Sequence, residues 1–270
     1  LLIDILNKTE SSNNNKRYER FINCGILINI SLESKRLKKK HLQLINDKNI
    51  LEYLLIRIKN KIDNLDNIKI ILNISEKSRD NNYEILKELC SKYEIKFFFG
   101  NHSNIPQRIN DCANFYGLTH IISVDGDDIL CSSDTMVNIF NEFNKNSNLK
   151  YIYSNNLPFG MNVFGFSKLY LEKCLYKEVK SYSVGWPDIF DDKDKYCLKS
   201  NYDNIINFEK LRFTLDYEID LIFFENILKN IDSTESDEII INYVNENKIY
   251  EINEYIISEY WNNFYKDKNN

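Results

Sequence analysis

Apolar stretches of strand length alternate with stretches of helical periodicity along this chain, and that alternation restricts its fold more than any other feature. The run at 25–30 is short, continuous and apolar, which suits a strand buried on both faces of a parallel sheet. Between 50 and 62 the apolar residues recur every three or four positions, which indicates a helix with one buried face. Such β-α alternation predicts a three-layer α/β/α sandwich with a mostly parallel sheet.

The later elements keep this order at first and become less regular after residue 150. Further strands are expected at 68–74, 95–99, 119–124, 151–153, 162–166 and 211–215, and further helices at 83–93, 105–116, 132–143, 217–229, 235–245 and 253–264. The segment 181–202 has little periodicity and is expected to be a long loop or flap. We expect one domain over 21–270, preceded by a flexible leader at 1–20.

Charge, hydropathy and cysteine spacing exclude several classes of protein. The net charge of −5 implies no strongly basic face, so nucleic acid is a poor candidate partner. No apolar run approaches the roughly 20 residues of a membrane span. The six cysteines are scattered without a C-x-x-C pair, which favours free thiols in a reducing compartment. We therefore expect a cytoplasmic protein that binds neither nucleic acid nor a membrane.

The first candidate site is the basic loop that follows the strand at 25–30. In an open α/β sheet, ligands bind at the carboxyl ends of the strands. Ser34, Arg36 and Lys40 place a hydroxyl donor and two cations on one short segment there, as a nucleoside triphosphate requires. The segment 31–40 contains no glycine, so it is not a Walker loop. A solvated basic loop without a ligand is the alternative interpretation.

The second candidate is the acidic cluster Asp125-Gly126-Asp127-Asp128 after the strand at 119–124. Carboxylates at the end of a strand, with a glycine that admits close backbone approach, suit Mg²⁺ held between protein and phosphates. An acidic turn that caps the next helix is the alternative interpretation.

A third group of charged residues lies at 212–220. Asp216 ends the strand expected at 211–215, so it is placed to point into a site, whereas Asp220 suits the first turn of a helix. Asp127 and Asp216 both end predicted strands, so we expect their carboxylates to converge at one edge of the sheet and to bind Mg²⁺.

These motifs occur together in an order typical of one family. The order is Ser34-Lys-Arg36-Leu-x-x-Lys40, then Pro106-x-Arg108, then Gly126-Asp127, then Arg212-x-Thr-x-Asp216-x-x-x-Asp220. It resembles the cytidylyltransferase family of spore-coat polysaccharide biosynthesis proteins, and more distantly the CMP-Kdo and CMP-sialate synthetases. The resemblance implies a nucleotide-diphospho-sugar transferase-like fold.

The resemblance also implies a reaction and a role for each matching residue. The enzyme would transfer CMP from CTP, or the corresponding nucleoside monophosphate from another nucleoside triphosphate, to a sugar or sugar-acid acceptor in surface polysaccharide biosynthesis. Ser34, Arg36, Lys40 and Arg108 would bind the nucleotide, and Asp127 and Asp216 would hold Mg²⁺. Arg36, Lys40 and Asp127 are then the candidate catalytic residues, and a homodimer is compatible with the family.

The basic loop also departs from the family's pattern, which keeps two other hypotheses open. Ser31 stands where the family usually has arginine, Glu33 where it has glycine, and Lys38-Lys39 where it has Pro-Gly. A degenerate paralogue that binds a nucleotide without turnover is therefore one alternative. A GT-A-type glycosyltransferase that uses Asp125-Gly126-Asp127 as its Asp-x-Asp metal motif is the other.

Overall fold

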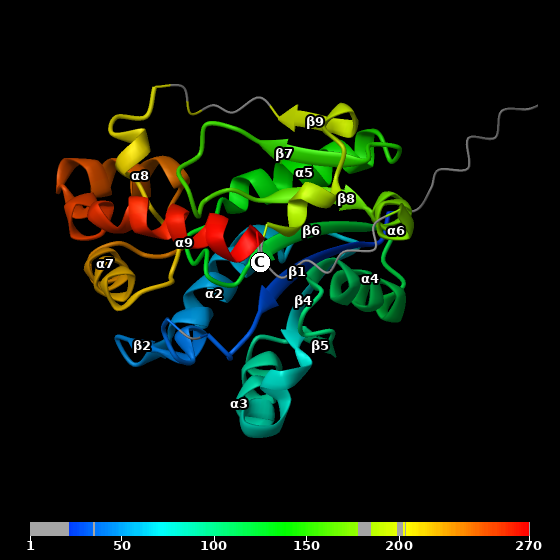
Figure 1. Ribbon diagram of the computed structural model, residues 1–270, viewed down its shortest axis with the longest axis horizontal. Helices are drawn as coiled ribbons and strands as arrows, with labels where there is room; N and C mark the ends of the chain where they lie inside the picture. The colour runs from blue at the N-terminus through cyan, green and yellow to red at the C-terminus, as the bar shows by residue number, and fades with distance from the viewer. Residues whose placement is uncertain (1–21, 35, 178–184, 199–201, 203, 270) are drawn as a thin grey trace, which may run out of the picture.

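A seven-stranded sheet with the order β5-β4-β1-β6-β8-β7-β9 lies at the centre of the molecule (Figure 1). The computed structural model describes residues 22–34, 36–177, 185–198, 202 and 204–269, so the expected leader at 1–20 falls outside the described residues. The strands are β1 (Cys24–Ile30), β4 (Ile68–Ser75), β5 (Lys96–Gly100), β6 (His120–Asp125), β7 (Tyr151–Ser154), β8 (Phe164–Ser167) and β9 (Lys195–Leu198). A separate hairpin pairs β2 (Leu44–Ile45) with β3 (Lys48–Asn49).

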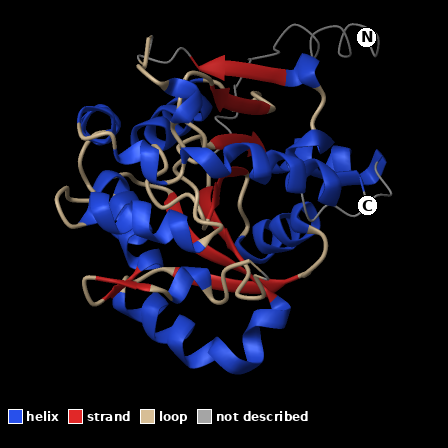
Figure 2. Cartoon of the chain, turned by 60° about the vertical axis from the view of Figure 1, so that its left-hand side comes forward, coloured by secondary structure: helices blue, strands red, loops and turns tan. Residues whose placement is uncertain are grey.

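Helices cover both faces of this sheet (Figure 2). They are α2 (Ile50–Ile62), α3 (Arg79–Lys92), α4 (Ile105–Tyr116), α5 (Ser133–Lys145), α6 (Lys168–Lys177), α7 (Glu218–Leu228), α8 (Asp237–Glu246) and α9 (Ile257–Asn269). β1 pairs in parallel with β4 and β6, and of the seven strands described only β8 is antiparallel to both of its neighbours. The predicted three-layer sandwich with a mostly parallel sheet is confirmed.

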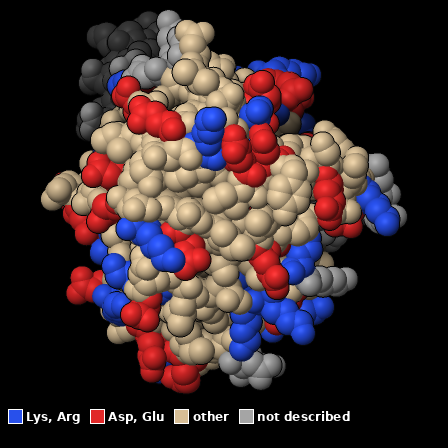
Figure 3. Space-filling view, turned by 90° about the vertical axis from the view of Figure 1, so that its left-hand side faces the viewer, with Lys and Arg blue, Asp and Glu red and all other residues tan. Residues whose placement is uncertain are grey.

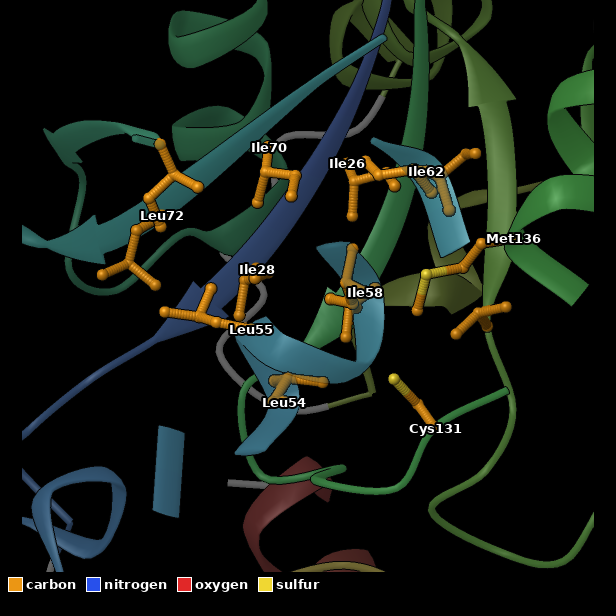
Figure 4. Packing of buried hydrophobic residues seen from close by; sticks show 14 of the residues in the cluster. Ile26, Ile28, Leu54, Leu55, Ile58, Ile62, Ile70, Leu72, Cys131 and Met136 are labelled. Atoms are coloured by element: carbon orange, nitrogen blue, oxygen red, sulfur yellow. The ribbon is translucent and has the colours of Figure 1, made fainter. Parts of the chain in front are cut away.

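The two faces of β1 supply the two main halves of the core, because successive side chains of a strand point to opposite faces. Ile26 and Ile28 pack with Leu55 and Ile58 of α2 and with Met136 of α5 (Figure 4). On the other face, Leu27 belongs to a cluster formed with α4 and α6. A third cluster joins α7 and α8 to the β2-β3 hairpin.

Two of the expected elements are wrong, because their backbone partners come from distant parts of the chain. Residues 211–215 form no strand of the sheet. Phe213 N donates instead to Phe159 O at 2.7 Å, and Leu215 N donates to Asp127 O at 2.9 Å. Within the expected loop 181–202, β9 pairs in parallel with the edge strand β7. The helix α6 was not expected at all.

No helix in the described part of the chain is both long and apolar enough to span a membrane. The surface formed by α7 and α8 carries acidic and basic side chains interspersed, without a face of one sign in that view (Figure 3). All six cysteines are free thiols.

Gly160 permits the loop after β7 to pass against residues 212–214, and it gives a test of this contact. Its φ is +87°, and a Cβ there would overlap the backbone carbonyl group of Phe213. We expect Gly160→Ala to lower the free energy of unfolding by about 1–3 kcal/mol, because the backbone strain of alanine at this positive φ adds to the overlap of its Cβ with Phe213.

Urea unfolding monitored by circular dichroism measures this loss, and Gly117→Ala is the matched control. Gly117 also has a positive φ, +63°, but the nearest atom to a Cβ there is 4.0 Å away. Equal losses in the two variants would show that the close approach to Phe213 contributes nothing.

Candidate active site

The loops after β1 and β6 meet at the carboxyl edge of the sheet. Asn29 and Asp125 are register partners at the ends of these strands, and Gly126 N donates to Asn29 O at 2.9 Å. A Cβ at Gly126 would overlap the Ile30 side chain and lie 3.1 Å from His41 Nε2. Glycine at this position therefore lets the acidic cluster turn back toward the basic loop.

Lys40 bridges the two carboxylates that the sequence predicts to converge. Its Nζ donates to Asp127 Oδ2 and lies 3.1 Å from Asp216 Oδ1. Burial of Lys40 opposes its charge, but Asp127 and Asp216 together raise the pKa of this amine above its ordinary value. The two carboxylates thus converge on a cationic nitrogen at the carboxyl edge of the sheet, which is the edge where open α/β sheets generally bind ligands.

Asp216 is surrounded by cations. Arg36 Nη2 lies 2.8 Å from Asp216 Oδ1, and Arg212 Nη2 lies 3.1 Å from Asp216 Oδ2. Arg212 also contacts Asp220, whose Oδ2 accepts from the Tyr217 backbone N–H as part of a capping box at the start of α7. Asp220 is therefore a helix-capping residue, as its position in the sequence predicts.

His41 is a site residue that the sequence analysis missed. Its Nε2 lies 2.8 Å from Asp127 Oδ1, and the side chain is 1% exposed. In the described part of the chain, His41 Nδ1 is buried without a hydrogen-bond partner. A position next to Lys40 is the only signal in the sequence, because its spacing to the other histidines and cysteines suggests no site.

The acidic cluster carries more negative charge than its neighbours neutralise. Desolvation and the neighbouring Asp127 raise the pKa of Asp125 to about 6, although its side chain is exposed. Desolvation, with Asp125 and Asp127, raises the pKa of Asp128 well above its usual value. Desolvation also acts to raise the pKa of Asp127. The charge of Lys40, and to a lesser extent the contact with His41, nevertheless hold that pKa far below the usual range. Additional positive charge would stabilise the cluster.

The other predicted nucleotide-binding residues lie apart from Lys40. The Ser34 hydroxyl accepts from Leu37 N at 3.4 Å, which is a contact within its own loop. Arg108 of α4 is 2% exposed and donates from Nη1 to Asn101 O at 3.1 Å. Desolvation lowers the pKa of Arg108 to about 10, although Asp125 acts in the opposite direction.

Buried polar groups at this edge leave hydrogen-bonding capacity for a ligand. Asn73 Nδ2 donates to Asn29 Oδ1 at 2.8 Å, and Asn29 Nδ2 donates to Ser123 Oγ at 2.9 Å, which joins β4, β1 and β6. Among the described residues, Asn73 Oδ1 and Arg108 Nε are buried without a partner. A donor and an acceptor buried in this way suit a polar ligand that the protein would desolvate.

No group of three or more His, Cys, Asp or Glu side chains is arranged to hold a metal ion within the described ranges. The structure thus brings together Arg36, Lys40, Asp127 and Asp216. It leaves Ser34 in a local turn and places Arg108 within electrostatic reach of Asp125.

Comparison with known proteins gives a consistent result. The sequence profile of a family described as Cytidylyltransferase matches residues 26–181. A protein of Methanocaldococcus jannaschii, named only as uncharacterized, is 29% identical over 223 residues, which cover 79% of this chain and 87% of that protein.

Solved structures show the same fold. A cytidylyltransferase from Leptospira borgpetersenii superposes with a TM-score of 0.74 at 21% identity, covering 86% of this chain and 98% of the other. A CMP:2-keto-3-deoxy-manno-octonic acid synthetase, solved in complex with CTP, gives a TM-score of 0.53 at 8% identity, covering 77% and 98% of the two chains.

Proposed function

The chain belongs to the cytidylyltransferase family, and on that premise we propose that it transfers CMP from CTP to a sugar or sugar-acid acceptor. An acceptor oxygen would attack the α-phosphorus in line, the bond from that phosphorus to the β-phosphate oxygen would break, and pyrophosphate would leave. The product would be a cytoplasmic activated sugar for surface polysaccharide biosynthesis.

The observation that carries this proposal is the meeting of Arg36 and Lys40 with Asp127 and Asp216 at the carboxyl edge of the sheet. Cations on a loop beside a strand end can bind phosphate oxygens, and Arg36 keeps a side chain that is 37% exposed and so accessible to a ligand. Arg108 would contact the nucleotide through the Nε that is unpartnered in the described structure. The Ser34 hydroxyl accepts from Leu37 N, so its own O–H is available to donate to a phosphate.

The residues also fit Mg²⁺, for which we propose Asp127 and Asp216 as ligands. Both carboxylates contact the same cationic nitrogen, so an ion with oxygen ligands could be held by the two side chains. Mg²⁺ prefers few protein ligands together with phosphates and water, so a larger metal cluster is not required. When bound, the ion would neutralise charge that develops on the phosphates. Lys40 would then turn from the carboxylates toward the nucleotide.

A pyrophosphate-release screen of nucleoside triphosphates against sugar and sugar-acid acceptors tests the reaction. Calorimetric titration with CTP and with UDP-sugars, each with Mg²⁺, separates the alternatives. Binding of UDP-sugars but not CTP would support a glycosyltransferase, and CTP binding without pyrophosphate release would support a degenerate paralogue.

Removal of the Arg36 charge gives a prediction about nucleotide binding. We expect Arg36→Gln to weaken CTP binding by about 10- to 100-fold, because a charge-assisted hydrogen bond contributes roughly 1.5–3 kcal/mol. Calorimetry with CTP and Mg²⁺ measures the dissociation constant. Lys38→Gln is the control, since Lys38 is an exposed cation of the same loop. Equal weakening by both variants would mean that the loop acts only through its net charge.

A further inference from the structure

The C-terminal helix α9 lies beside the proposed phosphate site, although it is distant from that site in the sequence. The helix is drawn in red in Figure 1 and approaches the middle of the sheet from the side of α7 and α8. Its Tyr260 ring centroid is 4.3 Å from Arg212 Cζ and 5.8 Å from Arg36 Cζ. Residues 257–269 lie outside the segment 26–181 that matches the family profile.

Arg36 is held by two aromatic rings in addition to Asp216. The Tyr217 ring centroid is 5.3 Å from Arg36 Cζ, so the guanidinium has a tyrosine from α9 and another from the start of α7 as neighbours. An arginine that is 37% exposed would otherwise sample many rotamers. A guanidinium that rings contact on its face keeps edge N–H groups that can donate to an anion.

The helix α9 also fixes the second ring and the second arginine. Asn263 Nδ2 donates to the Tyr217 hydroxyl at 3.3 Å. Tyr260 in turn packs against Phe159, with ring centroids 5.1 Å apart, so the ring is itself held in place. One turn of α9 therefore contacts both arginines that flank Asp216.

We propose that Tyr260 is a positioning residue for the phosphate loop: its ring, together with that of Tyr217, holds Arg36 where it can bind the nucleotide phosphates. This proposal rests on the proposed function, because it assumes that the anion bound by Arg36 is a nucleotide phosphate. It assigns a role in substrate binding to a helix beyond the matched family segment.

The test compares Tyr260→Leu with Tyr260→Phe in the full chain, alone and combined with Arg36→Gln. Leucine keeps an apolar side chain that can pack but has no aromatic face, whereas phenylalanine keeps the face. We expect Tyr260→Leu to weaken CTP binding in the presence of Mg²⁺ by about 3- to 30-fold. Tyr260→Phe should restore most of the affinity, and Tyr255→Leu, at a tyrosine that is 67% exposed, should leave it unchanged.

A double-mutant cycle distinguishes positioning from a general effect on the fold. If Tyr260 acts through Arg36, Tyr260→Leu will cause little further loss once Arg36 is glutamine. An equal loss in both backgrounds, or no rescue by phenylalanine, would overturn the proposal. If the wild-type chain binds no CTP, the proposed function fails. In that case the same double-mutant cycle is measured on the free energy of unfolding without nucleotide, and it tests the positioning role alone. An absence of coupling between Arg36 and Tyr260 would overturn that role.

Discussion

Replacing Asp127 with asparagine is expected to reduce CTP-dependent pyrophosphate release by on the order of 10²-fold or more. Asparagine keeps the size of the side chain but removes the charge that faces Lys40 and that would hold Mg²⁺. It also leaves Asp216 as the one carboxylate of the two that still pairs with the Lys40 amine. The turnover rate measured over a range of Mg²⁺ concentrations gives the size of the effect.

The fold is expected to survive this substitution, because the Asp127 side chain is 27% exposed on a loop and contributes little to packing. Thermal unfolding checks this point, so that lost turnover is not mistaken for lost structure. Asp66→Asn is the matched control, since Asp66 is exposed in the loop before β4, at the opposite edge of the sheet. Unchanged turnover of the Asp127→Asn enzyme would contradict both the metal site and the mechanism.

Local patterns in the sequence predict the parallel half of the sheet well. The helices at 50–62 and 105–116 have the expected bounds, and β1 begins one residue before the expected strand. Their apolar faces pack against strands of the same β-α units, so periodicity and capping residues carry the necessary information. Ser132, for example, caps α5 by accepting from Thr135 N at 3.0 Å.

The rest of the fold and of the candidate site depends on contacts between distant segments, and local sequence patterns do not encode these contacts. The strand expected at 211–215 has the composition of a strand, but its backbone bonds to Phe159 and Asp127 instead of to the sheet. Asp127 and Asp216 meet at Lys40 for a reason other than the expected one, because Asp216 ends no strand of the sheet and the bond from Leu215 N to Asp127 O brings the two segments together. The roles of His41 and Arg212 are likewise not visible in local patterns, because the first depends on the room left by Gly126 and the second on its bonds with Asp220.

The helix α2 shows how distant packing changes the interpretation of a charged residue. Its periodicity predicts one apolar face, with Arg57 lying outside that stripe. In the structure Arg57 is 0% exposed, because the loop before α8 and the start of α8 itself cover it. Its Nε donates to Cys131 O at 2.7 Å, and Nη1 donates to Ser233 O at 2.6 Å and to Glu235 O at 2.7 Å.

Arg57→Met is therefore expected to lower the free energy of unfolding by about 3–5 kcal/mol, because it breaks a buried ion pair and leaves one charge without its partner. Among the described residues, Asp237, also 0% exposed, would keep its bonds to the Ser132 and Tyr202 hydroxyls. The carbonyl groups that Arg57 bonds would be left buried without that donor, which adds to the loss. Urea unfolding at neutral pH measures the change.

Two further variants show whether the buried charge is the cause. Lys59→Met on the same helix removes a lysine whose partly exposed ion pair with Asp63 is 3.2 Å long. This substitution should lower the free energy of unfolding by no more than about 1 kcal/mol. Arg57→Met combined with Asp237→Leu removes both charges, so this double variant should be more stable than Arg57→Met alone. A double variant less stable than the single one would show that the bonds from the Ser132 and Tyr202 hydroxyls to Asp237 outweigh the penalty of its unpaired charge. Because Cys131 follows the acidic cluster closely in sequence, the bonds of Arg57 tie the loop after β6 to the start of α8.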